Sequence, residues 1–180
     1  AGIRAGSEKL QAIINAIARF GSENPVFIPI MLREIATGGE HLPDSMLIRK
    51  DLLDYAVAND TDLGHTLELF IVESDSAAGH VHPMVGSESG KSGFGAEGTR
   101  VAIDPAVNLA TRSCSPEALA IARTLQNYGT YIGDNAGNGS VLKLEQESSS
   151  HDVWPSTMAQ NELSGCISWD DFVVIQPGWQ

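Results

Sequence analysis

Short apolar segments, separated by stretches rich in glycine and proline, fill the middle and the end of this chain and constrain its fold most. Six of them have the length and the Val, Ile, Leu and Phe content of β-strands, at 66–72, 80–85, 99–103, 131–134, 141–147 and 171–176. Chain breakers such as Asp104-Pro105 and the AGNG turn at 136–139 lie between them. The pattern predicts a mainly β protein: an antiparallel, jelly-roll-like β-sandwich with two or three helices packed on it.

Three segments have the apolar spacing of amphipathic helices instead. The first follows Ser7, with apolar residues repeating at helical spacing until Gly21, and the second covers residues 47–58. The third begins at Ser115-Pro116-Glu117, which combines a capping residue, a proline in the first turn and an acid near the positive end of the helix dipole. We expect these helices to cover the predicted sheet.

The length of 180 residues suits one compact domain. Residues 1–45 are expected to form an N-terminal helix and a connecting segment, and residues 46–180 to form the β-sandwich core. Within that core, residues 86–98 contain five glycines and three serines, so we expect a long loop there. Long loops inside compact domains are commonly functional.

The charge balance restricts the partners. Acidic residues outnumber basic ones by 23 to 11, which gives a net charge of −12. Nucleic acids and anionic membranes bind clustered Lys and Arg, so neither is an expected partner. No apolar run approaches the roughly 18 residues that a membrane span needs. A strongly anionic polysaccharide would be repelled as well, unless the few arginines gather at one site.

Cysteines and glycosylation signals bear on the compartment. Cys114 and Cys166 are the only cysteines, and two thiols alone do not make a metal site. They form either one disulfide, closing a loop of roughly 50 residues, or two buried thiols. The triplets Asn59-Asp60-Thr61 and Asn138-Gly139-Ser140 would accept N-linked glycans if the chain is secreted by a eukaryote.

A pair of histidines is a candidate metal site. His80 and His82 are two residues apart, which places both imidazoles on one face of a strand, and Glu88 follows as a possible carboxylate ligand. This spacing resembles the first motif of cupins, but the gap before the glutamate is longer and a second motif is absent. Two polar residues on a half-exposed strand are the commoner explanation, so we expect no metal and no cofactor.

Acidic residues and tryptophans are candidates for a carbohydrate site. A glycosidase needs two carboxyl groups facing each other, one of them protonated, and a lyase uses a Tyr or His base. Several carboxylates fall near predicted strand ends: Asp75, Glu88, Glu97, Asp104, Asp134, Glu145 and Glu147. Taken singly, most of them are expected to be solvated charges. We expect Trp169 to be buried, and Trp154 and Trp179 to lie in open loops where they could stack on sugars.

One ordered series of motifs goes further. The chain carries IR at 48–49, GHTL at 64–67, VHP at 81–83, GTRVAIDP at 98–105 and LQNYGTYIGD at 125–134. This series resembles a group of secreted microbial proteins with the pattern IR…HAL, GTRLxLDP and LQxYGxYxxD. The resemblance covers roughly residues 46–145 and implies an extracellular protein associated with polysaccharide degradation. It also implies that the chain is part of a longer precursor or pairs with another fragment.

The resemblance also implies which residues form the site. The motif histidine falls on His65 and the terminal aspartate on Asp134, an acid/base pair next to Tyr131. A buried hydrogen bond between these two side chains, holding two strands together, is the plainer alternative. Substrate contacts are expected from Arg100, His82, Tyr128 and Trp154. The first hypothesis is therefore a glycoside hydrolase or polysaccharide lyase. A non-catalytic carbohydrate-binding module and a cupin-like metal enzyme are the alternatives.

Overall fold

The structure is a computed structural model that describes residues 46–145, 154 and 162–175. All of these residues belong to one compact unit of the chain, Pro43–Gln180. The predicted N-terminal helix and connecting segment at 1–45 lie outside the described residues, so that part of the domain prediction stays a prediction. No helix in the described part of the chain is long and apolar enough to cross a bilayer.

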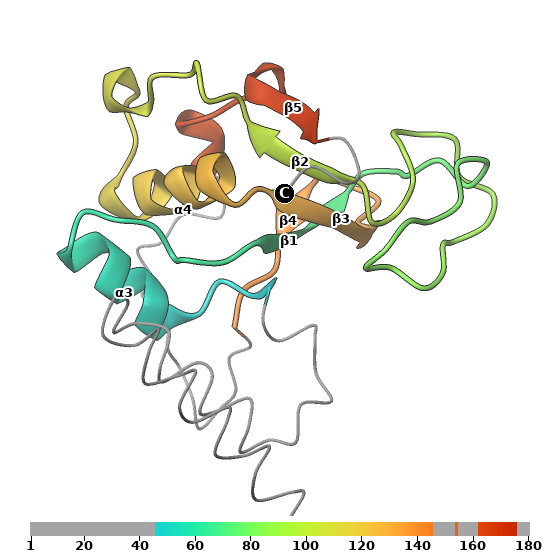
Figure 1. The fold of residues 1–180 in the computed structure, drawn as a ribbon, viewed down its shortest axis with the longest axis horizontal. Helices are drawn as coiled ribbons and strands as arrows, with labels where there is room; N and C mark the ends of the chain where they lie inside the picture. Colours follow the sequence, from blue (N-terminus) through green and yellow to red (C-terminus); the bar gives the residue numbers. More distant parts are fainter. Residues whose placement is uncertain (1–45, 146–153, 155–161, 176–180) are drawn as a thin grey trace, which may run out of the picture. The chain divides into compact units, whose positions relative to one another are not determined.

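A five-stranded mixed sheet forms the centre of the fold, in the order β4-β1-β3-β2-β5 (Figure 1). Its strands are β1 (Leu67–Ile71), β2 (Arg100–Ile103), β3 (Thr130–Asn135), β4 (Val141–Leu142) and β5 (Phe172–Ile175). β1 and β3 run parallel, and the other pairings are antiparallel. The described residues contain this one sheet with helices packed on it, and the jelly-roll sandwich with a second sheet stays a prediction.

The predicted helix that begins at Ser115 is confirmed as α4 (Pro116–Asn127). The Ser115 hydroxyl accepts a hydrogen bond from the backbone N–H of Ala118 at 3.1 Å, as an N-cap does. Gly129 follows the helix with φ of 70°, where a Cβ would lie 2.6 Å from the Val101 carbonyl oxygen. Only glycine fits this position, and it turns the chain directly from α4 into β3.

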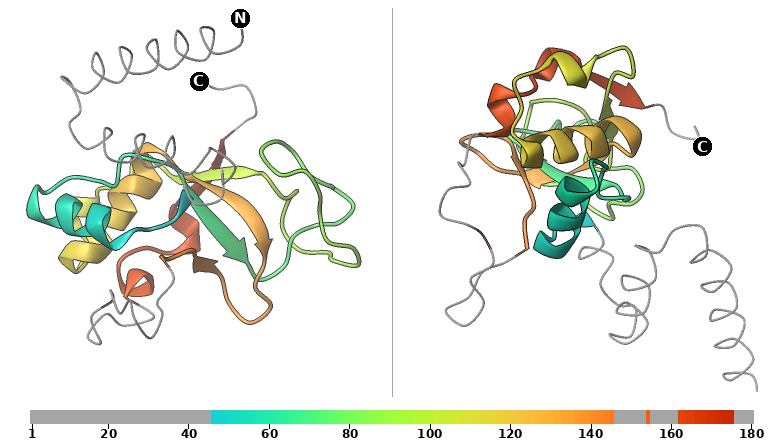
Figure 2. Two further views of the ribbon diagram at one scale, coloured as in Figure 1. Left: turned by 90° about the horizontal axis from the view of Figure 1, so that it is seen from below. Right: turned by 90° about the vertical axis from the view of Figure 1, so that its left-hand side faces the viewer.

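The second confirmed helix, α3 (Lys50–Ala58), packs against α4 through its buried side chains. Leu52, Leu53 and Ala56 are buried on α3. The buried hydroxyl of Thr124 on α4 accepts the backbone N–H of Leu63, at 2.9 Å, and so joins the two segments. Both helices lie at one end of the sheet, and the loop between β1 and β2 extends from the other end (Figures 1 and 2).

The sheet has a core face and a polar face, because side chains alternate along each strand. The core face carries the buried cluster of Leu69, Ile71, Val101 and Ile132, with Phe172 and Leu142 packed against it. We use the name polar face for the side that carries Glu68, Phe70, Arg100 and Tyr131, all of them half-buried. The burial pattern of β1, alternating between buried and half-buried, follows directly from this arrangement.

The prediction of a strand at residues 80–85 is wrong. His80 makes one isolated bridge to Glu97, and turns follow it. The backbone N–H of Val81 donates to the Glu97 carbonyl at 2.8 Å, but Pro83 has no N–H with which to continue a ladder. Val85 is 94% exposed, so the segment buries no apolar stripe that would hold it in a sheet.

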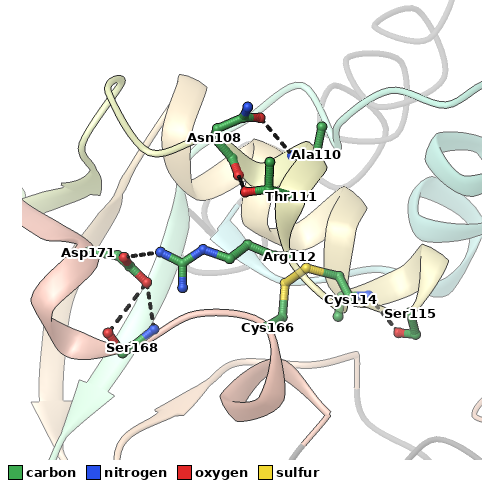
Figure 3. Close-up of a disulfide and its surroundings, with 10 residues drawn as sticks. Asn108, Ala110, Thr111, Arg112, Cys114, Ser115, Cys166, Ser168 and Asp171 are labelled. Carbon is green, nitrogen blue, oxygen red and sulfur yellow. Dashed lines mark hydrogen bonds and ion pairs between the residues drawn. A yellow bond between two sulfur atoms is a disulfide. The ribbon is translucent and has the colours of Figure 1, made fainter.

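The C-terminal part of the described chain is attached to the loop before α4 at two points (Figure 3). Cys114 and Cys166 form a disulfide, which decides between the two alternatives that the sequence left open. Arg112 donates to the Asp171 carboxylate at 2.6 Å. The short helices η3 (Leu163–Gly165) and η4 (Trp169–Asp171) then lead into β5, the edge strand beside β2.

Candidate functional site

Glu68, in the middle of β1, is the acidic residue most affected by its surroundings on the polar face. Burial raises the pKa of its carboxyl group, the Lys143 charge lowers it, and the Asp134 charge raises it. A Cβ on Gly133 of β3 would lie 2.3 Å from the Glu68 Oε1 atom. The Glu68 side chain therefore lies across β3, and glycine at position 133 provides the space.

Asp134 comes to the same region through a bulge in β3. The register shifts after Leu69, so that Asp134 rather than Gly133 lies opposite Phe70 of β1. One oxygen of its carboxylate accepts the backbone N–H of Asn135 at 2.7 Å. Glu68 and Asp134 thus form a pair of interacting carboxyl groups on two neighbouring parallel strands, and Asp134 is one of the residues predicted from the sequence.

Tyr131 and Arg100 continue a row of side chains across the polar face. Tyr131 is the register partner of Glu68 on β1 and also of Arg100 on β2. The Arg100 guanidinium carbon lies 5.8 Å from the centre of the Tyr131 ring, within the range of a cation–π contact. The three strands therefore place a carboxyl group, a phenol and a guanidinium side by side. Both Tyr131 and Arg100 were predicted site residues.

Arg100 also has a structural task. Its Nε and Nη2 atoms donate to the carbonyl oxygen of Tyr128, at 3.1 Å and 2.5 Å, at the C-terminus of α4. A cation at this end of a helix is favoured by the helix dipole. Tyr128 thus contributes its backbone to the cluster, and burial together with the Asp62 charge raises the pKa of its phenol.

Lys143, just after β4, completes the surroundings of Glu68. Its ammonium nitrogen lies 3.8 Å from the centre of the Phe70 ring. Its backbone N–H donates to the Glu68 carbonyl at 3.2 Å. A cation, two carboxyl groups and two aromatic rings therefore share one face of the sheet.

His65 does not join this cluster. It precedes β1, and its Nδ1 atom lies 2.9 Å from the Thr66 carbonyl oxygen. Asp134 is opposite Phe70, near the other end of the strand. At roughly 3.3 Å per residue, Leu67 and Phe70 alone are about 10 Å apart, and His65 lies two residues further back. The strand register therefore does not bring the predicted His65–Asp134 pair together.

The candidate metal ligands are not brought together either. His82 is exposed. The Glu88 carboxylate instead accepts a hydrogen bond from the Asn135 amide at 3.2 Å and forms an ion pair with Lys91 at 3.4 Å. Among the described residues, no group of three His, Cys, Asp or Glu side chains could hold a metal ion. The arrangement gives no support to the cupin-like alternative.

The buried polar network that lies next to Asp134 was not predicted from the sequence. Ser74 and Glu97 are 1% and 5% exposed, and the Ser74 hydroxyl donates to the Glu97 carboxylate at 3.2 Å. The Asn135 amide nitrogen donates to Glu97 as well, at 3.2 Å, and its oxygen accepts the Ser74 backbone N–H at 2.5 Å. Because these residues follow β1, precede β2 and end β3, the network fastens the long loop to the sheet.

The tryptophans differ from expectation. Trp169 is 57% exposed, so the prediction that it is buried is wrong. It lies in the three-residue helix η4, and its ring contacts Phe172 with the ring centres 5.4 Å apart instead of entering the core. Trp154 is half-buried and donates its indole N–H to the Glu145 carbonyl at 2.8 Å. Trp179 lies outside the described residues.

The polar face could carry out acid–base chemistry, because it combines a carboxyl group of raised pKa with a second carboxyl group. Sequence reasoning overlooked Glu68, although an acid in the middle of the apolar strand LELFI was a usable signal. Comparisons with protein families, curated proteins and solved structures found no match to this chain.

Proposed function

We propose that this protein is an extracellular enzyme that cleaves a polysaccharide at the polar face of its sheet. The observation that carries the proposal is the Glu68–Asp134 pair, in which burial raises the pKa of Glu68 despite the opposing Lys143 charge, and the Asp134 charge adds to the rise. Glycoside hydrolysis needs two carboxyl groups in different surroundings, one of which is kept protonated by a raised pKa. In this role, Glu68 donates a proton to the glycosidic oxygen, and Asp134 stabilises the sugar cation or activates water.

The neighbouring side chains suit this role. Phe70 and Tyr131 offer aromatic surface for the apolar faces of a sugar ring, although the Lys143 ammonium group covers one face of the Phe70 ring. Arg100 offers N–H groups for sugar hydroxyls, although its bonds to Tyr128 occupy part of the guanidinium. The presence of two carboxyl groups favours hydrolysis over elimination. Elimination needs a neutral or cationic group beside a uronate, and Glu68 and Asp134 would repel that substrate.

Secretion is supported by the covalent chemistry. The Cys114–Cys166 disulfide is typical of proteins from oxidising compartments, since cytosolic thiols are kept reduced. The strongly acidic composition, with a net charge of −12, is compatible with a soluble polymer as substrate and unfavourable for anionic ones. We therefore place neutral polysaccharides first among the substrates to be screened.

The test is a screen for release of reducing ends from a panel of neutral polysaccharides, with variants added once a substrate is found. Glu68→Gln removes the proton donor and keeps the shape, so the rate should fall about 10²- to 10⁴-fold. Glu73→Gln is the matched control, because Glu73 lies beyond the end of β1 and is not among the causes of the raised pKa of Glu68. Full activity of Glu68→Gln would refute the proposed site.

A second candidate function is a non-catalytic carbohydrate-binding module. It is favoured by the exposed Trp169 ring, which with Phe94 and Phe172 lines a cavity of about 420 Å³ on the core-face side of the sheet. Binding of oligosaccharides without turnover, abolished by Trp169→Ala and unchanged by Glu68→Gln, would favour this module over the enzyme. Titration calorimetry on the same panel distinguishes the two.

A further inference from the structure

The turn between β3 and β4 contains the one Asn-Gly pair in the sequence, Asn138-Gly139. Asn138 is exposed, and the preceding Gly137 has φ of 77°, a left-handed backbone conformation that glycine adopts without strain. The Asn138 backbone N–H donates to the Ala136 carbonyl at 3.0 Å. The main chain thus holds the turn, and the side chain is left at the surface.

The Asn138 side chain differs from those of the other asparagines that the structure describes. In each of the other four, the side-chain amide makes a hydrogen bond. Asn59 donates to the Tyr55 carbonyl, Asn127 to Asp62 and Asn135 to Glu97, while Asn108 accepts the Ala110 N–H. No hydrogen bond within the described part of the chain holds the Asn138 amide. Its carbonyl carbon is therefore free to turn towards its own backbone.

The following residue is equally unhindered. A Cβ added to Gly139 would have no heavy atom within 4 Å, and its φ does not lie in the left-handed region. No bond in the described residues occupies the Gly139 N–H. The backbone nitrogen of residue 139 can therefore reach the side-chain carbonyl of residue 138. Glycine has no side chain to block the approach, and it has the widest range of backbone angles.

We infer that Asn138 is a site of spontaneous deamidation through a cyclic imide. The Gly139 backbone nitrogen, having lost its proton, attacks the Asn138 Cγ atom and forms the new C–N bond. The bond from Cγ to Nδ2 breaks, and the nitrogen leaves as ammonia after taking up the proton. Water then opens the imide at either carbonyl, giving aspartate or isoaspartate, so that –NH₂ is exchanged for –OH with no oxidant or enzyme.

The modification changes the edge of the sheet. Either product adds a negative charge to the turn, and isoaspartate also adds a backbone methylene between β3 and β4. β4 is only two residues long and pairs with β1 through Leu142 and Val141. A lengthened turn therefore weakens the pairing of the strand that leads to Lys143. This inference does not depend on the proposed function.

The test is incubation of the purified full-length chain at mildly alkaline pH and physiological temperature, followed by peptide mapping with mass spectrometry. We expect Asn138 to convert first, with isoaspartate as the main product, while Asn59 and Asn127 remain intact. The rate should rise with pH, because the attacking nitrogen must lose a proton. Retention of Asn138, or faster conversion of Asn59 or Asn127, would overturn the inference.

Two further arms separate the local chemistry from general damage. Gly139→Ala should fold normally, because its Cβ meets open space, and should slow conversion at Asn138 severalfold. In denaturant, Asn59 and Asn127 lose their hydrogen bonds and should begin to convert, so their protection in the folded chain is measured directly. An unchanged rate at Asn138 in Gly139→Ala would exclude the imide route.

Discussion

Glu68 occupies a position where a charged group is costly, because burial raises the pKa of its carboxyl group against the opposing Lys143 charge, and the Asp134 charge adds to the rise. An apolar or neutral side chain would suit a strand of this kind better. Costly groups of this sort concentrate at functional sites, where stability is given up for reactivity. At the scale of single residues, this is the observation on which the proposed role of the polar face rests.

The cost of Glu68 is measurable as a pH-dependent stability. Its pKa in the folded state lies above the unfolded value, so protonated Glu68 favours folding in acid, and this contribution is lost as pH rises through the folded pKa. Glu68→Gln cannot ionise, so it should match the wild type in acid and be more stable at neutral pH. Urea denaturation at a series of pH values measures this. A less stable variant at neutral pH would contradict it.

The sequence located some of these residues and not others. Asp134, Tyr131 and Arg100 were named from the motif resemblance, and they do lie together on the polar face. Glu68 was not named, because an acid in an apolar strand shows its importance only when its neighbours are known. His65 was named, but it precedes β1, whereas Asp134 lies opposite Phe70 near the other end of that strand.

At the scale of elements, helix ends and strand cores were read correctly where local chemistry decides them. The N-cap of α4 at Ser115 and its end at Gly129 follow from hydrogen bonding and backbone geometry within a few residues. The segment at 80–85 has strand-like side chains but no strand, because pairing depends on a partner elsewhere in the chain. Local sequence does not contain that information.

The short helix η4 offers a test at this scale. The Asp171 carboxylate accepts the Ser168 backbone N–H at 2.8 Å and pairs with Arg112. The hydrogen bond from the Ser168 backbone N–H is the main cause of the lowered pKa of Asp171, and Arg112 lowers this pKa further. The Asp171 carboxylate therefore stabilises the fold above its unfolded pKa, and this contribution is lost as pH falls through the folded pKa.

Asp171→Asn keeps an acceptor oxygen but loses the charge that strengthens the Ser168 and Arg112 contacts, so it should lose about 1 kcal/mol at neutral pH. The difference from the wild type should shrink in acid. Asp170→Asn is the matched control, since Asp170 is exposed and makes no such bonds among the described residues. Thermal unfolding of the two variants at neutral and acidic pH measures this. Equal effects of the two substitutions would show that the Asp171 contacts are unimportant.

At the scale of the whole molecule, the disulfide joins parts of the chain that are far apart in sequence. Cys114 and Cys166 are separated by 52 residues, and β5 follows shortly after Cys166 at the edge of the sheet. The cross-link restricts the unfolded chain, and a loop of this length corresponds to about 4 kcal/mol in the chain-entropy account. A domain of this size has only about 5–15 kcal/mol of stability in total.

Replacing both cysteines by serine should therefore lower the free energy of unfolding by about 2 to 5 kcal/mol. Chemical denaturation with and without a reducing agent measures the loss. The reduced wild type should unfold at the same denaturant concentration as the double variant, which serves as the control for serine itself. A reduced wild type as stable as the oxidised protein would show that the cross-link contributes nothing.

The sequence by itself determined what depends on near neighbours: the two helices, the strand segments with strong apolar cores, the breaks between them and the acidic charge. Only the tertiary structure decided the strand order, the parallel pairing of β1 with β3 and the cysteine pairing. It also decided that Glu68 rather than His65 accompanies Asp134. The physical reason is that register, burial and charge interactions depend on groups brought close by packing, and sequence distance says little about them.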